Sequence, residues 1–158
     1  MIRPETPADY EWIRALHTEA FAPSPLEAQI VDDLRAAGDH VPELCLVHSH
    51  GHVMISRGRV DDHPALGLGP IAVTPTHQRQ GIGGELLRAV IERAQASHYT
   101  LIALLGHPTY YPRFGFRPGH ELGVETTYTA PPEAWMVLPL PAYSGDVRGT
   151  FPYASAFP

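Results

Sequence analysis

One stretch of this sequence, residues 66–87, places an apolar segment, a glycine-rich turn and the start of a helix in direct succession. Residues 69–73 are apolar or small, as expected for a strand buried on both faces, and Pro75 ends the run. After the turn, apolar residues recur at helical spacing, at Ile82, Leu86, Leu87, Val90, Ile91 and Ala94. The pattern predicts a strand, a turn and a helix that begins near Ile82.

The turn before this helix is rich in glycine, at Gly81, Gly83 and Gly84. Backbone N–H groups at the start of a helix have no partner within the helix, and the helix dipole favours negative charge there. A side chain at these positions would hold a phosphate away from the amides. The stretch therefore predicts an anion site.

The length of 158 residues is that of one ordinary domain, and 44% hydrophobic with 18% charged residues indicates a globular chain. We expect residues 1–140 to form the domain and residues 141–158, rich in proline and aromatics, to pack on it as a tail. No apolar run is long enough to span a bilayer, so we expect no membrane partner. Residues 1–5 lack the pattern of a signal peptide, and we expect a cytoplasmic protein.

The formal net charge is −6, and because the chain has no lysine every basic residue is an arginine. This balance argues against nucleic acid, which needs a concentrated basic face, and weakly favours an amine-bearing substrate. The single cysteine, Cys45, lies in an apolar run and is expected to be a buried, inert thiol. His48, His50 and His52 alternate, but a glycine interrupts them and no acid or cysteine completes a zinc site. We expect exposed hairpin histidines and no metal.

The order of elements indicates an α+β domain with one mixed sheet. A hydroxyl residue, a proline and an acid three residues on mark two helix starts, at Thr6 and Ser24. The remaining expected elements are strands at 2–4, 44–49, 52–60, 99–105 and 134–138 and a short helical segment at 109–114, with a hairpin turn at His50 and Gly51.

Three classes of ligand bind glycine-rich turns at helix starts. Nucleoside triphosphate loops need a lysine after the glycines, and this chain has none. Residues 67–72 imitate the dinucleotide fingerprint, but they lie inside the expected strand and not at its end. The third class is the pyrophosphate of coenzyme A.

Two motifs carry a resemblance to a family of the third class. Residues 78–83, QRQGIG, match the Gln/Arg-x-x-Gly-x-Gly/Ala signature of the GCN5-related N-acetyltransferase (GNAT) superfamily. Residues 110–116, YYPRFGF, resemble its Tyr-x-x-x-Gly-Phe segment, and the whole chain looks like the YhbS-like bacterial subgroup. The resemblance implies the GNAT fold, a mixed and mostly antiparallel sheet with a V-shaped splay flanked by helices. The splay would lie between strands 66–74 and 100–105.

The resemblance also implies acetyl-CoA as the acyl donor, with no metal. The amides of the turn would hold the pyrophosphate, and the pantetheine arm would lie along the central strand. The residues it assigns to cofactor binding are Ile71, Ala72, Val73, Gln78, Arg79, Gln80, Gly81, Ile82, Gly83, Gly84 and Tyr111.

In this superfamily an amine attacks the acetyl carbonyl directly. The Val73 amide is the candidate donor to the carbonyl, and Tyr111 matches the general acid that protonates the departing sulfur. Tyr110 could hold that role instead, or both tyrosines could belong to an aromatic cluster. No carboxylate lies on residues 66–74, so His107 is the candidate proton acceptor, with a structural role as its alternative.

The predicted function is an N-acetyltransferase for a primary amine of a small molecule or peptide. The alternative is a non-catalytic acyl-CoA-binding sensor or scaffold module, which the missing strand carboxylate favours. We expect the acceptor between the first two helices and residues 119–134. Its unranked candidate contacts are Trp12, Glu19, Phe21, Glu125 and Tyr128. A homodimer is left open.

Overall fold

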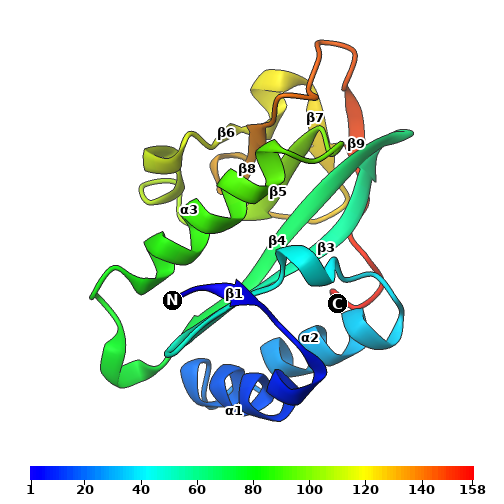
Figure 1. The fold of residues 1–158 in the computed structure, drawn as a ribbon. Coiled ribbons are helices and arrows are strands. Elements are labelled where there is room, and N and C mark those ends of the chain that lie inside the picture. The colour runs from blue at the N-terminus through cyan, green and yellow to red at the C-terminus, as the bar shows by residue number, and fades with distance from the viewer.

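The computed structural model describes all 158 residues and contains a seven-stranded sheet and a small two-stranded one (Figure 1). In spatial order the large sheet contains β1 (Arg3–Pro4), β2 (Leu46–His48), β3 (Gly51–Val60), β4 (His63–Val73), β5 (Leu101–Leu105), β8 (Trp135–Pro139) and β6 (Arg117–Pro118). All neighbours pair antiparallel except β4 and β5, which are parallel. The mixed, mostly antiparallel sheet is the predicted one.

Three α-helices cover the sheet: α1 (Tyr10–Ala20), α2 (Leu26–Ala36) and α3 (Ile82–Gln95). Adjacent residues of β3 point to opposite faces. His52 contacts His17 of α1, whereas a Cβ at Gly51 would lie 2.9 Å from Leu86 of α3. The pair α1 and α2 therefore lies on one face and α3 on the other, as Figure 1 also shows.

Local sequence explains where the first two helices begin and end. Asp9 accepts a hydrogen bond from the Thr6 amide at 2.8 Å, forming the predicted capping box ahead of α1. The Ser24 hydroxyl accepts from the Leu26 amide at the start of α2. Gly38, at φ +74°, ends the turn after α2.

The strands β4 and β5 separate, as the splay requires. Their pairing is limited to Leu66 with Ile102 and Gly67 with Ala103. Beyond Gly67, β4 continues to Val73 with β3 on one edge and no strand on the other. Residues 69–73 are therefore not buried on both faces as expected, because the divergence of β5 leaves all of them except Ala72 partly exposed.

Three short strands were absent from the sequence-based expectations: β6, β7 (Val124–Thr126) and β9 (Gly149–Phe151). Strands of two or three residues are too short to show an alternating pattern. β7 and β9 pair in parallel, and Val147 and Phe151 are buried against the main body. The Trp135 indole donates to the Val124 carbonyl at 2.8 Å and joins this small sheet to the large one.

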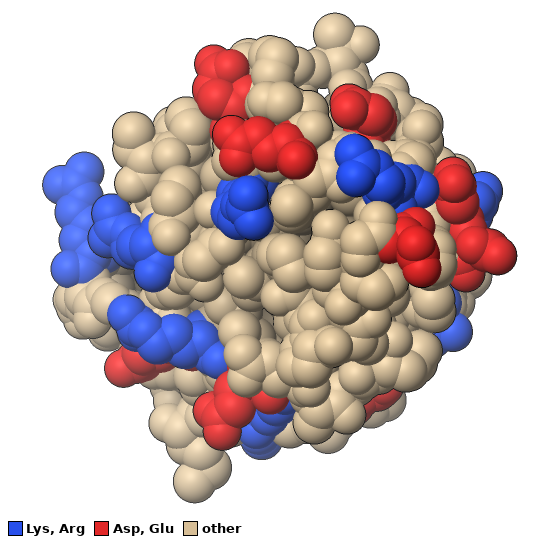
Figure 2. Space-filling model, turned by 90° about the horizontal axis from the view of Figure 1, so that it is seen from above, with Lys and Arg blue, Asp and Glu red and all other residues tan.

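Cys45 is fully buried, as expected, and burial raises the pKa of its thiol to about 12. None of the helices is both long and apolar enough to cross a membrane. On the face seen in Figure 2, basic and acidic side chains are interspersed over a largely uncharged surface.

Candidate active site

The glycine-rich turn forms one wall of a pocket of about 460 Å³. The other walls come from the end of β4, the first two turns of α3 and the segment after β5. Arg79 at φ +64° and Gly81 at φ +86° adopt left-handed conformations, and α3 begins at the next residue, Ile82. The turn therefore points the first amides of α3 into the pocket, as an anion site requires.

The glycines of α3 leave room that the fold itself does not need. A Cβ at Gly83 would lie 3.8 Å from the Tyr110 hydroxyl, and one at Gly84 would lie 3.5 Å from Arg88. Both are ordinary van der Waals distances, and both residues have helical rather than left-handed backbones. Neither packing nor backbone conformation therefore requires glycine here, and the bare backbone leaves room for a group such as a pyrophosphate.

Three arginines, Arg79, Arg88 and Arg113, line the same pocket, and no carboxylate does. Arg113 lies 4.6 Å from the centre of the Tyr110 ring, and Arg88 lies 5.5 Å from that of Phe114. These contacts hold two guanidinium groups at the pocket wall. In a chain of net charge −6, this concentration of positive charge favours an anionic ligand.

Of these arginines, sequence reasoning identified Arg79 alone. Arg88 follows Gly84 by four residues and so lies on the same face of the helix, a spacing that could have revealed it. Arg113 lies inside the Tyr-x-x-x-Gly-Phe segment but at a variable position of that motif. Only the approach of this segment to α3 brings Arg113 to the pocket.

Val73 directs its amide toward the splay. The next residue, Thr74, donates its N–H to the His50 carbonyl at 2.8 Å. Because amides alternate in direction along a strand, the Val73 N–H points away from β3 and toward the gap left by β5. The Val73 carbonyl accepts from the Gln78 side chain at 3.2 Å, which ties the turn to the end of β4.

The two neighbouring tyrosines lie in different surroundings. Tyr110 lines the pocket beside the glycine turn. Tyr111 packs against Gly106 at the end of β5, where a Cβ would lie 2.3 Å from its ring, and edge-on to Phe116 at 5.8 Å. Burial raises the pKa of Tyr111, so the hydroxyl keeps its proton at neutral pH.

His107 is exposed just beyond β5. Its backbone carbonyl accepts from the Tyr110 amide at 3.2 Å and from the Tyr111 amide at 3.5 Å. His107 therefore shapes the turn that carries both tyrosines, while its imidazole makes no hydrogen bond within the chain and does not line the pocket.

The expectation of exposed hairpin histidines is wrong for His52, which is fully buried. Its Nε2 lies 2.8 Å from a Glu5 carboxylate oxygen, and its Nδ1 lies 2.9 Å from His17 Nε2. Because the carboxylate can only accept, His52 Nε2 carries the proton and His52 Nδ1 accepts from His17. Arg35 completes the network with bonds of 2.7 and 3.1 Å to Glu5.

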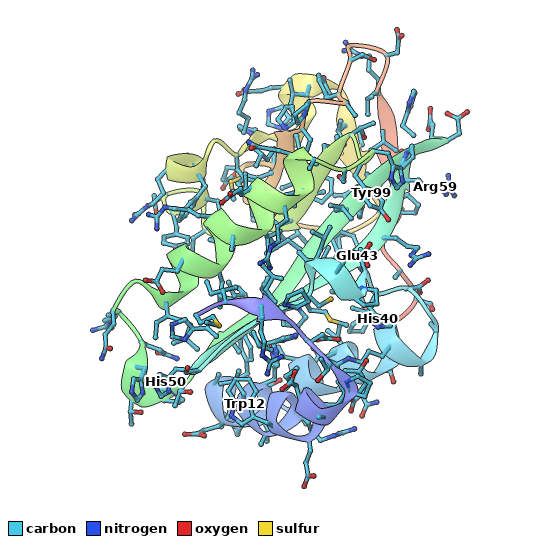
Figure 3. The ribbon with its side chains drawn as sticks, in the orientation of Figure 1. Trp12, His40, Glu43, His50, Arg59 and Tyr99 are labelled. Atoms are coloured by element: carbon cyan, nitrogen blue, oxygen red, sulfur yellow. The ribbon has the colours of Figure 1, made fainter.

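Burial controls the charge of this network. It lowers the pKa of His17 to about 3 and also lowers the pKa of His52, so both imidazoles are neutral at pH 7. By contrast, Figure 3 shows His50 at the end of the β2–β3 hairpin, where its ring stacks on His77 with centres 3.6 Å apart. No three His, Cys, Asp or Glu side chains lie close enough together to hold a metal ion.

Comparisons with known proteins agree with this geometry. A family model described as an acetyltransferase (GNAT) domain matches residues 42–118. Over 155 residues the chain is 34% identical to YjhQ of Escherichia coli K12, named an uncharacterized N-acetyltransferase, and the match covers 90% of this chain and 85% of YjhQ. The chain belongs to the GNAT family.

Two solved structures of GNAT proteins match nearly the whole chain. YhbS from E. coli, in complex with CoA, superposes with a TM-score of 0.89 at 28% identity, covering 99% of this chain and 91% of YhbS. A GNAT acetyltransferase from Brucella melitensis, in complex with acetyl-CoA, superposes with a TM-score of 0.80 at 31% identity, covering 100% of this chain and 97% of the Brucella chain. The predicted family, its YhbS-like subgroup and the fold are confirmed.

Proposed function

We propose that this GNAT protein transfers an acetyl group from acetyl-CoA to a primary amine of a small molecule or peptide. One observation carries the proposal: bare glycine backbone, three arginines and the free edge of β4 meet in a single pocket. The relatives solved with CoA and acetyl-CoA support the choice of donor.

The cofactor would be held mostly by the main chain. The amides of residues 79–84 bind the pyrophosphate, and Arg88 and Arg113 add positive charge beside it. The unpaired edge of β4 from Ile71 to Val73 pairs with the amides of the pantetheine arm as a neighbouring strand would. Gln78 acts by fixing the turn to Val73.

The reaction forms an N–C bond and breaks the C–S bond. The Val73 amide donates to the acetyl oxygen as negative charge develops on it. Tyr111, a phenol that is protonated at neutral pH, gives its proton to the departing thiolate. The amine loses its proton through water to His107, the exposed histidine beyond β5.

The test measures binding and turnover separately. Acetyl-CoA should raise the melting temperature, and an amine panel should release free thiol from it. Tyr111→Phe should lower kcat about 100-fold and leave the acetyl-CoA shift intact, because the ring and its packing remain. Tyr99→Phe, outside the pocket, is the matched control.

Three outcomes would redirect the proposal. Normal turnover in Tyr111→Phe with slow turnover in Tyr110→Phe assigns the acid to Tyr110. Binding of acetyl-CoA without turnover on a broad panel favours the sensor or scaffold, which the absence of a carboxylate on residues 66–74 also favours. If acetyl-CoA does not change the melting temperature at all, the assignment of acetyl-CoA as the cofactor is wrong.

A further inference from the structure

A second pocket, of about 240 Å³, opens where β4 and β5 begin to separate. It is lined by Leu68, which follows the last β4 residue paired with β5, and by Leu105 at the end of β5. Phe21, directly after α1, and Glu27, in the first turn of α2, also line it. This pocket thus lies on the α1–α2 side of the sheet, and the glycine turn belongs to the α3 side.

The charges of the two pockets are opposite. The pocket at the glycine turn has three arginines and no carboxylate, whereas Glu27 is the one Asp, Glu, Arg or His in the second. A phosphate-bearing ligand is favoured in the first and disfavoured in the second. The second pocket instead complements a cation.

Glu27 also has a structural role, since one of its carboxylate oxygens accepts from the Ser24 hydroxyl at 2.8 Å. This contact uses Oε1 and leaves Oε2 for a ligand. The side chain is only partly exposed, so an ion pair there is screened less than on the open surface. The Ser24 contact also holds the carboxylate in one position, which lowers the cost of binding.

Aromatic rings form much of the remaining wall, from Phe21, Tyr128, Tyr153 and Phe157. The Tyr128 and Tyr153 rings meet edge-on with centres 4.6 Å apart, and Tyr153 meets Phe157 at 5.0 Å. The Tyr128 hydroxyl donates to the carbonyl of Pro158 and anchors the end of the chain, which Figure 1 places beside α2. The C-terminal tail therefore supplies part of the pocket.

From this arrangement we infer that the second pocket binds the acetyl acceptor, and that the acceptor is a small primary amine on an aromatic or compact apolar body. The inference rests on the proposed function, because it assigns the amine that the reaction needs. The ammonium pairs with Glu27 on binding and releases one proton to solvent before the neutral amine attacks, and the body packs on the rings, whose faces attract cations. The volume is below the ~300–1,000 Å³ of pockets for drug-sized ligands, which suits a small molecule.

The pocket also refines the expected acceptor contacts. Phe21 and Tyr128 line it, whereas Trp12, Glu19 and Glu125 do not. Trp12 instead lines a separate hollow beside β1, with Arg3 and Asp9. Figure 3 shows Trp12 on α1.

The experiment compares two probes with the same body, 2-phenylethylamine, which ends in a charged ammonium, and 2-phenylethanol, which ends in a neutral hydroxyl. Their binding is measured by calorimetric titration at pH 7, with and without CoA. The wild type should bind the amine about tenfold or more tightly than the alcohol, as expected for a charged hydrogen bond. Glu27→Gln should erase the difference, because glutamine keeps an acceptor for Ser24 and loses the charge. Glu19 is an exposed carboxylate outside the pocket, so Glu19→Gln should retain the preference for the amine. Phe21→Ala should weaken both probes.

Equal binding of amine and alcohol by the wild type, or an unchanged preference in Glu27→Gln, would overturn the inference. If ethanolamine binds as tightly as 2-phenylethylamine, the acceptor does not need an aromatic or apolar body, and that part of the inference is wrong. Thiol release, measured in parallel, reports on the proposed function separately. Amine binding at Glu27 without thiol release on the whole amine panel leaves an amine site but rejects both catalysis and the acceptor role, whereas turnover that Glu27→Gln does not affect keeps the proposed function and overturns the assignment of this pocket.

Discussion

Replacing Gly83 by alanine should separate the needs of the fold from those of the ligand. The added methyl group meets nothing closer than 3.8 Å, and the backbone is already helical. Alanine is favoured over glycine in helices by up to ~1 kcal/mol. For a chain of this size that corresponds to a rise of about 2–4 °C in the melting temperature without ligand.

The same methyl group should weaken acetyl-CoA binding, because it occupies space in front of the α3 amides. At a concentration 100 times Kd, acetyl-CoA stabilises the wild type by ~2.7 kcal/mol. Loss of one hydrogen bond to a charged phosphate costs ~1.5–3 kcal/mol, or about 10- to 150-fold in Kd. The stabilisation at the same concentration then falls to about 1.4 kcal/mol or less. Gly83→Glu adds charge repulsion and should abolish it.

The assay is thermal unfolding with and without acetyl-CoA, followed by calorimetric titration. Gly145→Ala is the matched control, because a Cβ at Gly145 meets nothing within 4 Å and this residue lies far along the chain in the tail. We expect two opposite effects: without ligand, Gly83→Ala is more stable than the wild type, whereas acetyl-CoA stabilises the variant less than it stabilises the wild type. A lower melting temperature without ligand, or an undiminished ligand shift, would refute the reasoning from the glycine backbone.

Two further predictions concern charge. The lowered pKa of His17, about 3 against an ordinary 6.5, means that below pH 6.5 the unfolded chain takes up a proton that the folded chain does not. Stability should therefore fall as the pH drops, by about 2 kcal/mol between pH 7 and pH 5 from His17 alone. Urea unfolding of His17→Gln should show a weaker pH dependence than wild type, whereas the exposed His98→Gln should match wild type; equal slopes in both variants would reject the assignment. Separately, Arg88→Gln and Arg113→Gln should each weaken CoA binding about fivefold in low salt, and less in high salt, as partly exposed ion pairs do. Arg93→Gln, on α3 but outside the pocket, should bind CoA normally, and equal losses in all three variants would point to net charge and not to the site.

Much of the candidate site could be predicted because its parts are consecutive in sequence. The end of β4, the turn and the start of α3 occupy residues 71–84, and the backbone supplies most of the proposed contacts. Glycine at these positions and apolar residues at helical spacing then suffice to indicate where the amides point. The glycine-rich turn and the Tyr-x-x-x-Gly-Phe segment together resemble the motifs of the GNAT family, and the matches to YjhQ and YhbS confirm the family.

Other features depend on partners that are remote in sequence. From the sequence, His52 is expected to be an exposed hairpin histidine. In the fold it hydrogen-bonds with Glu5 and His17, and these bonds offset the free-energy cost of burying a polar side chain. β7 and β9 are strands only because each supplies the backbone hydrogen-bond partners of the other.

The sequence by itself indicated the family, through two motifs that resemble those of GNAT proteins. It also predicted the order of the main elements and the glycine-rich turn, because these are encoded in local spacing and backbone preference. Only the tertiary structure decided which remote side chains complete the charge of each pocket. Arg113 lines the pocket of the glycine turn from the segment after β5, and Glu27 lines the second pocket together with Tyr153 and Phe157 from the far end of the chain. The full charge of a pocket includes side chains that only folding brings together, so local patterns can predict no more than part of it.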